Sequence, residues 1–335
     1  MIKLGYKASA EQFGPNELLD YAVLSEDLGL DSVWISDHFQ PWRHTGGHAP
    51  FSLAWLGALG ARTRRIVMGT SVLTPTFRYH PSVIAQAFAT LGDMFPKRVI
   101  LGLGTGESLN EVPASGLHWP EQKERTARFR EAIRLIRQLW CEERVTFEGQ
   151  FYQTALATIY DKPKDPVPLY IAAAGPFMAK LAGSEGDGFI CTSGKKWDLY
   201  TETLLPNVQA GLDAAGRAVD ASYERMIEMK VSFDTDRERA RSDTHFWGAL
   251  ALSADEKVSV EDPIQMEKLA DALPVERTAS RWIVTDDPEE MTERIGAYVK
   301  LGFEHLVFHA PGPDQARFLR LFAERVAPRL RSKFG

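Results

Sequence analysis

Residues 32–38 read Ser-Val-Trp-Ile-Ser-Asp-His, an apolar stretch that ends on two titratable side chains, Asp37 and His38. Similar short apolar runs predict strands at residues 2–6, 32–36, 66–71, 99–104, 169–173, 188–192, 226–233 and 305–309. Amphipathic segments typical of helices lie between them, at residues 16–28, 82–94, 121–140 and 288–301. This alternation predicts βα units arranged on a parallel sheet.

The positions of the polar residues favour a closed barrel. An open doubly wound sheet, the alternative, places its site at one switch point, whereas a barrel collects residues from the carboxyl ends of nearly all its strands. Here polar groups follow most of the predicted strands, at residues 7–11, 37–38, 71–74, 105–107, 174–175, 192–195 and 309. We therefore expect one (β/α)8 TIM barrel over residues 1–335. Residues 234–274 are charged and only partly periodic, and are expected to form an insertion over the barrel mouth.

Composition excludes several classes of protein. With 335 residues, of which 44% are hydrophobic and 25% charged, the chain buries a large core and is neither disordered nor fibrous. A net charge of −6 argues against a nucleic-acid partner, and two cysteines exclude a disulfide framework. The longest uncharged stretch, residues 44–61, contains glycine, proline and histidine that disfavour a membrane helix, and the N-terminus lacks an apolar signal core. These features predict a cytoplasmic protein without a membrane partner.

Two titratable residues are candidates for proton transfer. His38 follows a buried strand, where an imidazole with an ordinary pKa of about 6.5 can exchange protons, although a structural histidine would occupy the same position. Glu107 ends the sequence Gly-Leu-Gly-Thr-Gly-Glu at residues 102–107. Its carboxylate stands where a dinucleotide fingerprint needs glycine and would repel a pyrophosphate. The glycines instead allow a planar ligand to approach the backbone. Trp42 is a candidate for the wall of the same pocket, although packing in the core is the commoner role of a tryptophan.

The sequence predicts no metal site. His44 and His48 flank Thr45-Gly46-Gly47, and a spacing of four residues suits two ligands on a helix. The two glycines disfavour a helix there, and no carboxylate completes a metalloprotease pattern.

A small anion-binding turn is predicted at Thr192-Ser193-Gly194-Lys195. It is not a P-loop, because Phe189 stands where the first glycine belongs and Lys196 replaces the following Ser or Thr. Hydroxyl, backbone N–H and ammonium groups remain as anion ligands. A phosphate monoester carries about −1.5 to −2 charge at pH 7, so further cations should converge on it. Lys257 and Arg281 are the candidates, and the arginine offers a bidentate fork.

Long sequence blocks carry a resemblance that covers essentially the whole chain. They are KLGYKASAEQF (3–13), SDHFQPWR (36–43), GGHAPFS (46–52), GTSVLTPTFRY (69–79), AQAFAT (85–90), GFICTSGK (188–195), ADALP (270–274), RWIV (281–284) and LVFHAPG (306–312). With them the chain resembles the coenzyme F420-dependent glucose-6-phosphate dehydrogenases, a branch of the bacterial-luciferase-like barrels. The resemblance implies a homodimer that oxidises glucose 6-phosphate to 6-phosphogluconolactone, with hydride transfer from sugar C1 to C5 of the deazaflavin F420.

The resemblance also implies the site residues. The catalytic positions are His38, Glu107 and Trp42. The cofactor contacts are Asp37, Ser71, Val72, Thr74, Thr105, Gly106, Asn110, Ala174, Gly175, Phe177 and Met178. The substrate contacts are Glu11, Thr192, Lys195, Lys257 and Arg281. A non-proline cis peptide is expected at Ser71–Val72, and Ala174 departs from a glycine that the family commonly has.

The expected chemistry assigns a proton to each titratable group. Loss of a hydride from C1 requires removal of the anomeric hydroxyl proton, for which His38 is the expected base. Glu107 would manage the proton at the reduced deazaflavin, at N1, although the two roles can be exchanged. The alternatives are a dehydrogenase of another sugar 6-phosphate or alcohol, a flavin-dependent monooxygenase, a non-catalytic F420 carrier, and a metal-dependent sugar-phosphate isomerase or hydrolase.

Overall fold

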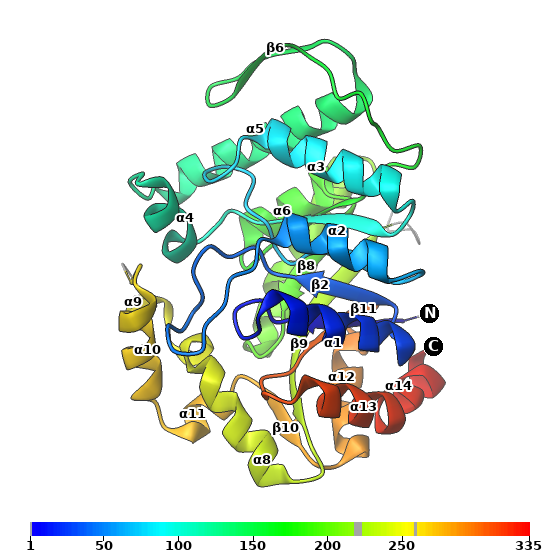
Figure 1. The fold of residues 1–335 in the computed structure, drawn as a ribbon, viewed down its shortest axis with the longest axis vertical. Helices are drawn as coiled ribbons and strands as arrows, with labels where there is room; N and C mark the ends of the chain where they lie inside the picture. The colour runs from blue at the N-terminus through cyan, green and yellow to red at the C-terminus, as the bar shows by residue number, and fades with distance from the viewer. Residues whose placement is uncertain (1, 218–222, 258–259) are drawn as a thin grey trace.

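Eight parallel strands close into a barrel in the computed structural model, which describes residues 2–217, 223–257 and 260–335 (Figure 1). The strands are β1 (Lys3–Ala8), β2 (Ser32–Ile35), β3 (Val67–Thr70), β4 (Val99–Leu103), β7 (Leu169–Ala172), β8 (Gly188–Thr192), β9 (Glu224–Phe233) and β11 (His305–His309). They follow the order β9-β11-β1-β2-β3-β4-β7-β8, and pairing of β8 with β9 closes the ring. The predicted barrel is confirmed at all eight strands, and the open-sheet alternative is wrong.

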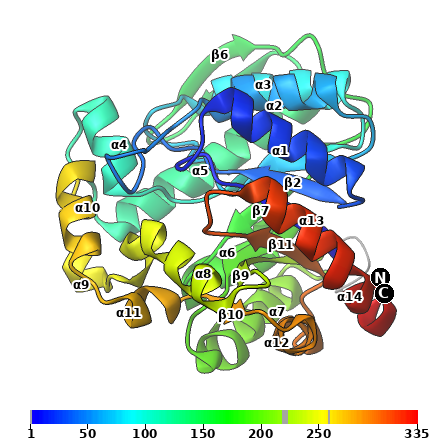
Figure 2. The same cartoon turned by 60° about the horizontal axis from the view of Figure 1, so that its bottom comes forward.

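Helices between the strands form the outer layer (Figures 1 and 2). They are α1 (Pro15–Asp27), α2 (Ser52–Arg62), α3 (Pro81–Met94), α5 (Gln122–Cys141), α6 (Pro176–Glu185), α7 (Leu205–Ala214), α12 (Pro288–Lys300), α13 (Gln315–Arg325) and α14 (Ala327–Phe334). A π-helical turn, η1 (Leu199–Leu204), precedes α7. Proline at the start of α1, α3, α6 and α12 suits the first helical turn, where no N–H is needed. The four predicted amphipathic helices are confirmed as α1, α3, α5 and α12.

The barrel interior is a packed core, as is typical of this fold. Side chains from six of its strands form one cluster, made of Trp34, Ile100, Tyr170, Ile190, Met226 and Val307. A Cβ at Gly69 would lie 2.7 Å from the Trp34 ring, so glycine on β3 makes room for this indole. Because this core fills the space between the strands, a ligand site can form only at an end of the barrel.

Three strands in the described part of the chain were not predicted from the sequence. β5 (Val145–Glu148) and β6 (Gln153–Ala157) form an antiparallel hairpin outside the barrel, at the top of Figure 1. The Glu131 carboxylate on α5 accepts hydrogen bonds from the backbone N–H groups of Gln150, Phe151 and Tyr152, so a distant residue orders the turn. The short β10 (Ile283–Thr285) pairs with the end of β9.

Short helices follow β9, and those at Ala254–Lys257 and Pro263–Asp271 lie near α4 (Ser108–Ser115) at one end of the barrel (Figures 1 and 2). They are α8 (Arg237–Ser242), the 3-10 helix η2 (Asp243–Ala251), α9 (Ala254–Lys257), α10 (Pro263–Asp271) and α11 (Val275–Ala279). Trp42 packs against their small core, and Arg43 forms ion pairs with Glu267 and Asp271 on α10. The division into one domain with an insertion at residues 234–274 stays a prediction. In the described ranges, no helix is both long and apolar enough to span a bilayer.

Candidate active site

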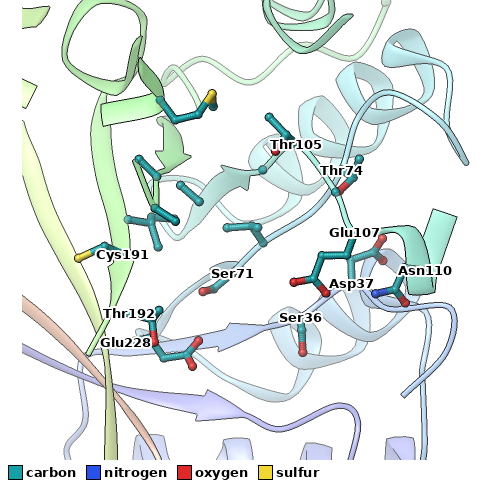
Figure 3. A pocket seen from close by; sticks show the side chains of 18 of the residues that line it. Ser36, Asp37, Ser71, Thr74, Thr105, Glu107, Asn110, Cys191, Thr192 and Glu228 are labelled. Atoms are coloured by element: carbon teal, nitrogen blue, oxygen red, sulfur yellow. The ribbon is translucent and has the colours of Figure 1, made fainter. Parts of the chain in front are cut away.

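The carboxyl ends of the barrel strands surround a cavity of ≈ 640 Å³. Residues at the ends of all eight barrel strands line it, in agreement with the distribution of polar residues along the sequence. Its volume lies in the range of small-molecule sites, about 300–1,000 Å³. Figure 3 shows Thr192 and Glu228 at one end of this cavity and Thr74 and Thr105 at the other.

His38 borders the cavity and lies beside a carboxylate, without a hydrogen bond to it. Its Nδ1 lies 3.3 Å from Glu11 Oε1, and its ring centroid is 5.9 Å from that of Trp42. Burial opposes ionisation of Glu11, but the nearby His38 and Lys7 outweigh it and lower the pKa of Glu11. An ionised Glu11 beside Nδ1 favours the tautomer whose Nε2 carries the lone pair. The arrangement therefore suits His38 to accept a proton at Nε2.

Glu107 lines the cavity at the end of β4. The open cavity leaves its side chain accessible, yet the surrounding protein desolvates the carboxyl group, and this raises its pKa. His38 and Lys257 act in the opposite direction without cancelling the effect. A raised pKa lets a carboxyl group hold a proton that it can donate. The two groups proposed for proton transfer thus border one cavity.

Small residues form one wall of the cavity. Val72, Gly104 and Thr105 line it, and a Cβ at Gly104 would lie 2.6 Å from the Val72 side chain. The predicted cis peptide between Ser71 and Val72 is confirmed. Gly106 adopts a φ of +81°, and a Cβ there would lie 2.9 Å from Thr74. The wall thus presents backbone and small side chains to a planar ligand.

Asp37 and Asn110 also line this side of the cavity, and both make internal hydrogen bonds. The Asp37 carboxylate accepts from the hydroxyls of Ser52 and Tyr79 and from Arg78 at 2.6, 2.9 and 2.8 Å. Asn110 Oδ1 accepts from the backbone N–H groups of residues 39 and 40. The Asp37 bonds join the end of β2 to α2 and to the segment before α3, and the Asn110 bonds join the loop after β2 to the segment that follows β4, so both side chains have a structural role beside any contact with a ligand.

The N-terminus of α6 completes the wall. Gly175 is its N-cap without a side-chain hydrogen bond, and a Cβ there would meet nothing within 4 Å. Ala174, Phe177 and Met178 line the cavity here, with Phe177 half exposed. Uncapped amides at a helix N-terminus attract anions.

Positive charges gather beside the opposite part of the cavity. Thr192 lines it, and a Cβ at Gly194 would lie 2.3 Å from the Arg281 backbone oxygen, so the predicted anion-binding turn packs directly against Arg281. Burial, then Arg281 and Lys230, lowers the pKa of Lys195. Burial, opposed by Glu107 and reinforced by Lys195 and Arg281, lowers the pKa of Lys257 to about 8. The predicted cations therefore converge, although Lys195, Lys257 and Arg281 stand beside the lining rather than in it.

The sequence analysis missed a charged group on the cavity floor. Glu228 and Lys230 on β9 line the cavity with Lys7 and His309, and Lys230 Nζ bonds to Glu228 Oε1 at 2.8 Å and Thr192 Oγ1 at 2.9 Å. Two charged residues that alternate within the apolar strand at 226–233 were the available signal, because residues two apart point to the same face.

His44 and His48, rejected as metal ligands, are exposed. In the part of the chain that the structure describes, no three His, Cys, Asp or Glu side chains are grouped to hold a metal ion.

Comparison with known proteins places the chain in a family. The family model for luciferase-like monooxygenases matches residues 2–305. An F420-dependent glucose-6-phosphate dehydrogenase of Nakamurella multipartita is 65% identical over 334 residues, 100% of this chain and 98% of that protein. Its counterpart in Beutenbergia cavernae is 63% identical over 333 residues, 99% of this chain and 98% of that protein. A solved F420-dependent secondary alcohol dehydrogenase, in complex with an F420-acetone adduct, superposes with a TM-score of 0.92 at 32% identity, covering 98% of this chain and 99% of that one.

The fold and the match to the family model define the class of this protein, which is a luciferase-like (β/α)8 barrel. The chain belongs to this family, and within it to the F420-dependent glucose-6-phosphate dehydrogenases.

Proposed function

We propose that this protein oxidises D-glucose 6-phosphate to 6-phospho-D-glucono-1,5-lactone, with hydride transfer from sugar C1 to C5 of oxidised coenzyme F420. The observation that carries the proposal is one cavity lined by a wall of small residues and a histidine beside a carboxylate, with converging cations of lowered pKa next to it. Relatives more than 60% identical over the full chain carry this activity in their names.

The cavity residues fit coenzyme F420. The wall of Val72, Gly104 and Thr105 can back a planar ring, and the uncapped N-terminus of α6 can take an anionic group of the cofactor. When bound, F420 supplies a carbon acceptor, C5, for a hydride. Asp37, Ser71, Thr74, Gly106, Asn110, Ala174, Gly175, Phe177 and Met178 are the other proposed contacts.

His38 is the proposed base for the C1 hydroxyl. With Nδ1 turned to Glu11, Nε2 can take the hydroxyl proton as the hydride leaves C1, which avoids a cationic sugar. Trp42 limits the position of the imidazole from one side. Positioned proton transfer of this kind contributes about 10²–10⁴-fold to a rate.

Glu107 is the proposed acid. Its raised pKa keeps a larger fraction of the carboxyl group protonated near neutral pH than an ordinary glutamate would have. It can therefore deliver a proton to N1 of the cofactor ring. The different surroundings of Glu11 and Glu107, one ionised beside a histidine and one desolvated, support different roles for the two carboxyl groups.

The cations are the proposed phosphate site. Beside the larger effect of burial, Arg281 lowers the pKa of both Lys195 and Lys257, and Lys195 lowers that of Lys257, so a phosphate dianion would relieve this repulsion. The Thr192 hydroxyl adds a polar contact. A secondary alcohol has no group for these cations, which favours a sugar phosphate over the substrate class of the solved relative.

Anaerobic mixing of the purified protein with F420 and candidate substrates tests the proposal. We expect glucose 6-phosphate to bleach the absorbance of oxidised F420, while free glucose and 2-propanol react far more slowly. Binding of F420 without bleaching by any sugar phosphate would indicate a carrier. Activity that disappears on chelation would indicate a metal-dependent enzyme.

A homodimer is proposed as the assembly, and exposed apolar side chains on adjacent helices support it. Phe51 precedes α2, and Val83 and Met94 lie on one face of α3; each is at least half exposed. Light scattering should give a molar mass twice that of the chain, and the double variant Val83→Glu, Met94→Glu should have the molar mass of a single chain. A cytoplasmic location remains a prediction.

A further inference from the structure

His309 is a buried cavity residue to which the mechanism above gives no task. It ends β11, is 2% exposed, and lines the cavity. Trp247 and Trp282 pack on its ring in edge-on geometry, with centroids at 4.5 and 5.0 Å. Nδ1 lies 3.3 Å from Glu228 Oε1, within ion-pair distance, but neither Nδ1 nor Nε2 has a hydrogen-bond partner among the described residues. A buried polar atom without a hydrogen-bond partner destabilises the folded state, so it needs an explanation.

The neighbours of His309 determine what its ring can offer. Lys230 Nζ lies 2.8 Å and Lys7 Nζ 3.5 Å from Glu228, which keeps this carboxylate ionised beside Nδ1. Burial above all lowers the pKa of His309, and the two lysines add to the effect against Glu228. The ring is then neutral, with its proton on Nδ1 facing the carboxylate. Nε2 is left as a hydrogen-bond acceptor at the cavity wall.

The strand order places His309 between the two ends of the proposed substrate. The phosphate cations lie beside the end of β8, where the turn at Gly194 packs on Arg281, and His38 follows β2. Between β8 and β2 the ring of strands runs β9, β11 and β1. A hexose with its phosphate at the cations and C1 at His38 therefore passes over β11. The wall of small residues proposed for the cofactor stands on the other arc, at β3, β4 and β7.

We propose that His309 is a specificity-determining residue: its Nε2 accepts a hydrogen bond from one ring hydroxyl, at C2, C3 or C4, of the bound hexose 6-phosphate, and Glu228 positions the ring through Nδ1. The proposal rests on the proposed function. A hydroxyl is the fitting donor, since a lone-pair acceptor repels phosphate oxygens. One fixed acceptor also discriminates between sugars that differ at a single hydroxyl.

The test compares glucose 6-phosphate with its 2-deoxy, 3-deoxy and 4-deoxy analogues. For the wild type, kcat/KM should fall about tenfold or more for the analogue that lacks the contacted hydroxyl. In His309→Phe, kcat/KM for glucose 6-phosphate should fall by a similar factor, and that one analogue should lose nothing further. For the other two analogues, the ratio of kcat/KM for glucose 6-phosphate to kcat/KM for the analogue should be the same in His309→Phe as in wild type. His309→Gln, which retains an acceptor oxygen, should recover part of the discrimination.

A structural role would give another pattern. If His309 only supports the fold, His309→Phe should reduce kcat/KM for all four sugars by one factor and leave every ratio intact, which would overturn the proposal. His245→Phe is the matched control, because this histidine on η2 is partly exposed and pairs with Asp271. It should change no ratio. Thermal unfolding and F420 titration verify that each variant is folded and binds the cofactor.

Binding measured without turnover separates this proposal from the proposed function. Calorimetry with 1,5-anhydroglucitol 6-phosphate, which has no anomeric hydroxyl to oxidise, should show weaker binding to His309→Phe than to wild type by about tenfold. Failure of the proposed function appears as a wild type that does not reduce F420 with glucose 6-phosphate. Failure of the His309 assignment appears as an active wild type together with a His309→Phe variant that keeps the wild-type deoxy-sugar ratios and the wild-type affinity for 1,5-anhydroglucitol 6-phosphate.

Discussion

β11 and β9 place one histidine–glutamate pair at each end of the barrel, and the two pairs differ in how completely they are bonded. At the amino end, His305 bonds to Ser32 Oγ through Nε2 at 2.7 Å and to Glu224 through Nδ1 at 2.8 Å. At the carboxyl end, His309 Nδ1 lies 3.3 Å from Glu228, and neither ring nitrogen has a hydrogen-bond partner in the described ranges. The two pairs contain the same residue types, four positions apart on each strand, but the histidine is fully hydrogen-bonded at the amino end (the closed end) and not at the carboxyl end (the open end).

The difference has a physical cause. At the amino end, Trp34 Nε1 also bonds to Ser32 Oγ at 3.0 Å, and Lys3 pairs with Glu224, so protein groups satisfy the cluster and seal the barrel. At the carboxyl end, the cavity leaves space where such a partner would stand. Barrel enzymes hold stability at the amino face and chemistry at the carboxyl face. Substitutions at the two ends should therefore separate loss of rate from loss of stability.

The largest effect is expected at the open end. His38→Ala should lower kcat at least a hundredfold with little change in F420 affinity, because proton transfer by a positioned base is lost. Stopped-flow reduction of F420 and a fluorescence titration measure the two quantities. A rate equal to that of wild type would remove His38 from the mechanism.

Arg281→Ala should act on substrate binding. Loss of a charged hydrogen bond to phosphate, about 1.5–3 kcal/mol, should raise KM for glucose 6-phosphate roughly 10- to 150-fold while the Kd of F420 changes little. Arg294→Ala, which removes an exposed arginine on α12, is the matched control and should change neither value. If Arg281→Ala binds both ligands normally, the phosphate lies elsewhere.

The closed end should respond in stability and not in rate. Glu224→Gln leaves His305 and Lys3 without their charged partner, and we expect the free energy of unfolding at pH 7 to fall by about 2–3 kcal/mol. The kcat of the folded variant should stay within about twofold of wild type. Urea denaturation and steady-state kinetics provide the two values. A large loss of kcat without loss of stability would contradict the division between the two ends.

The smallest and most specific effect is on pH dependence. Burial disfavours the charge on Glu224, but the hydrogen bond from His305 and the pairing with Lys3 prevail and lower its pKa to about 2. Because the folded-state pKa lies below the ordinary value of about 4.3, the stabilisation is complete above that pH and disappears as pH falls toward 2. The difference in unfolding free energy between wild type and Glu224→Gln should shrink over that range. A difference that is constant from pH 7 to pH 3 would show that the charge of Glu224 is not responsible.

Most of the fold was predictable because hydrophobic period and helix-start residues are local signals. The eight strands and the helices α1, α3, α5 and α12 follow from them. The hairpin β5–β6 was not predictable, because Glu131 on α5 orders its turn from about twenty residues away. β10 was missed because it has three residues and depends on the end of β9 for its pairing.

The candidate site divides in the same way. His38, Glu107 and the turn at Thr192 are visible as polar residues that follow apolar strands, and the long sequence blocks identify their family. The predicted strand 305–309 places His309 at its carboxyl end and His305 at its amino end, but the sequence does not show that Ser32 bonds to His305 while both ring nitrogens of His309 stay unbonded. That distinction comes from closure of the barrel, which brings strands distant in the chain together and leaves space at one end only. Residue types thus set which chemistry is available, and packing sets which groups remain free to perform it.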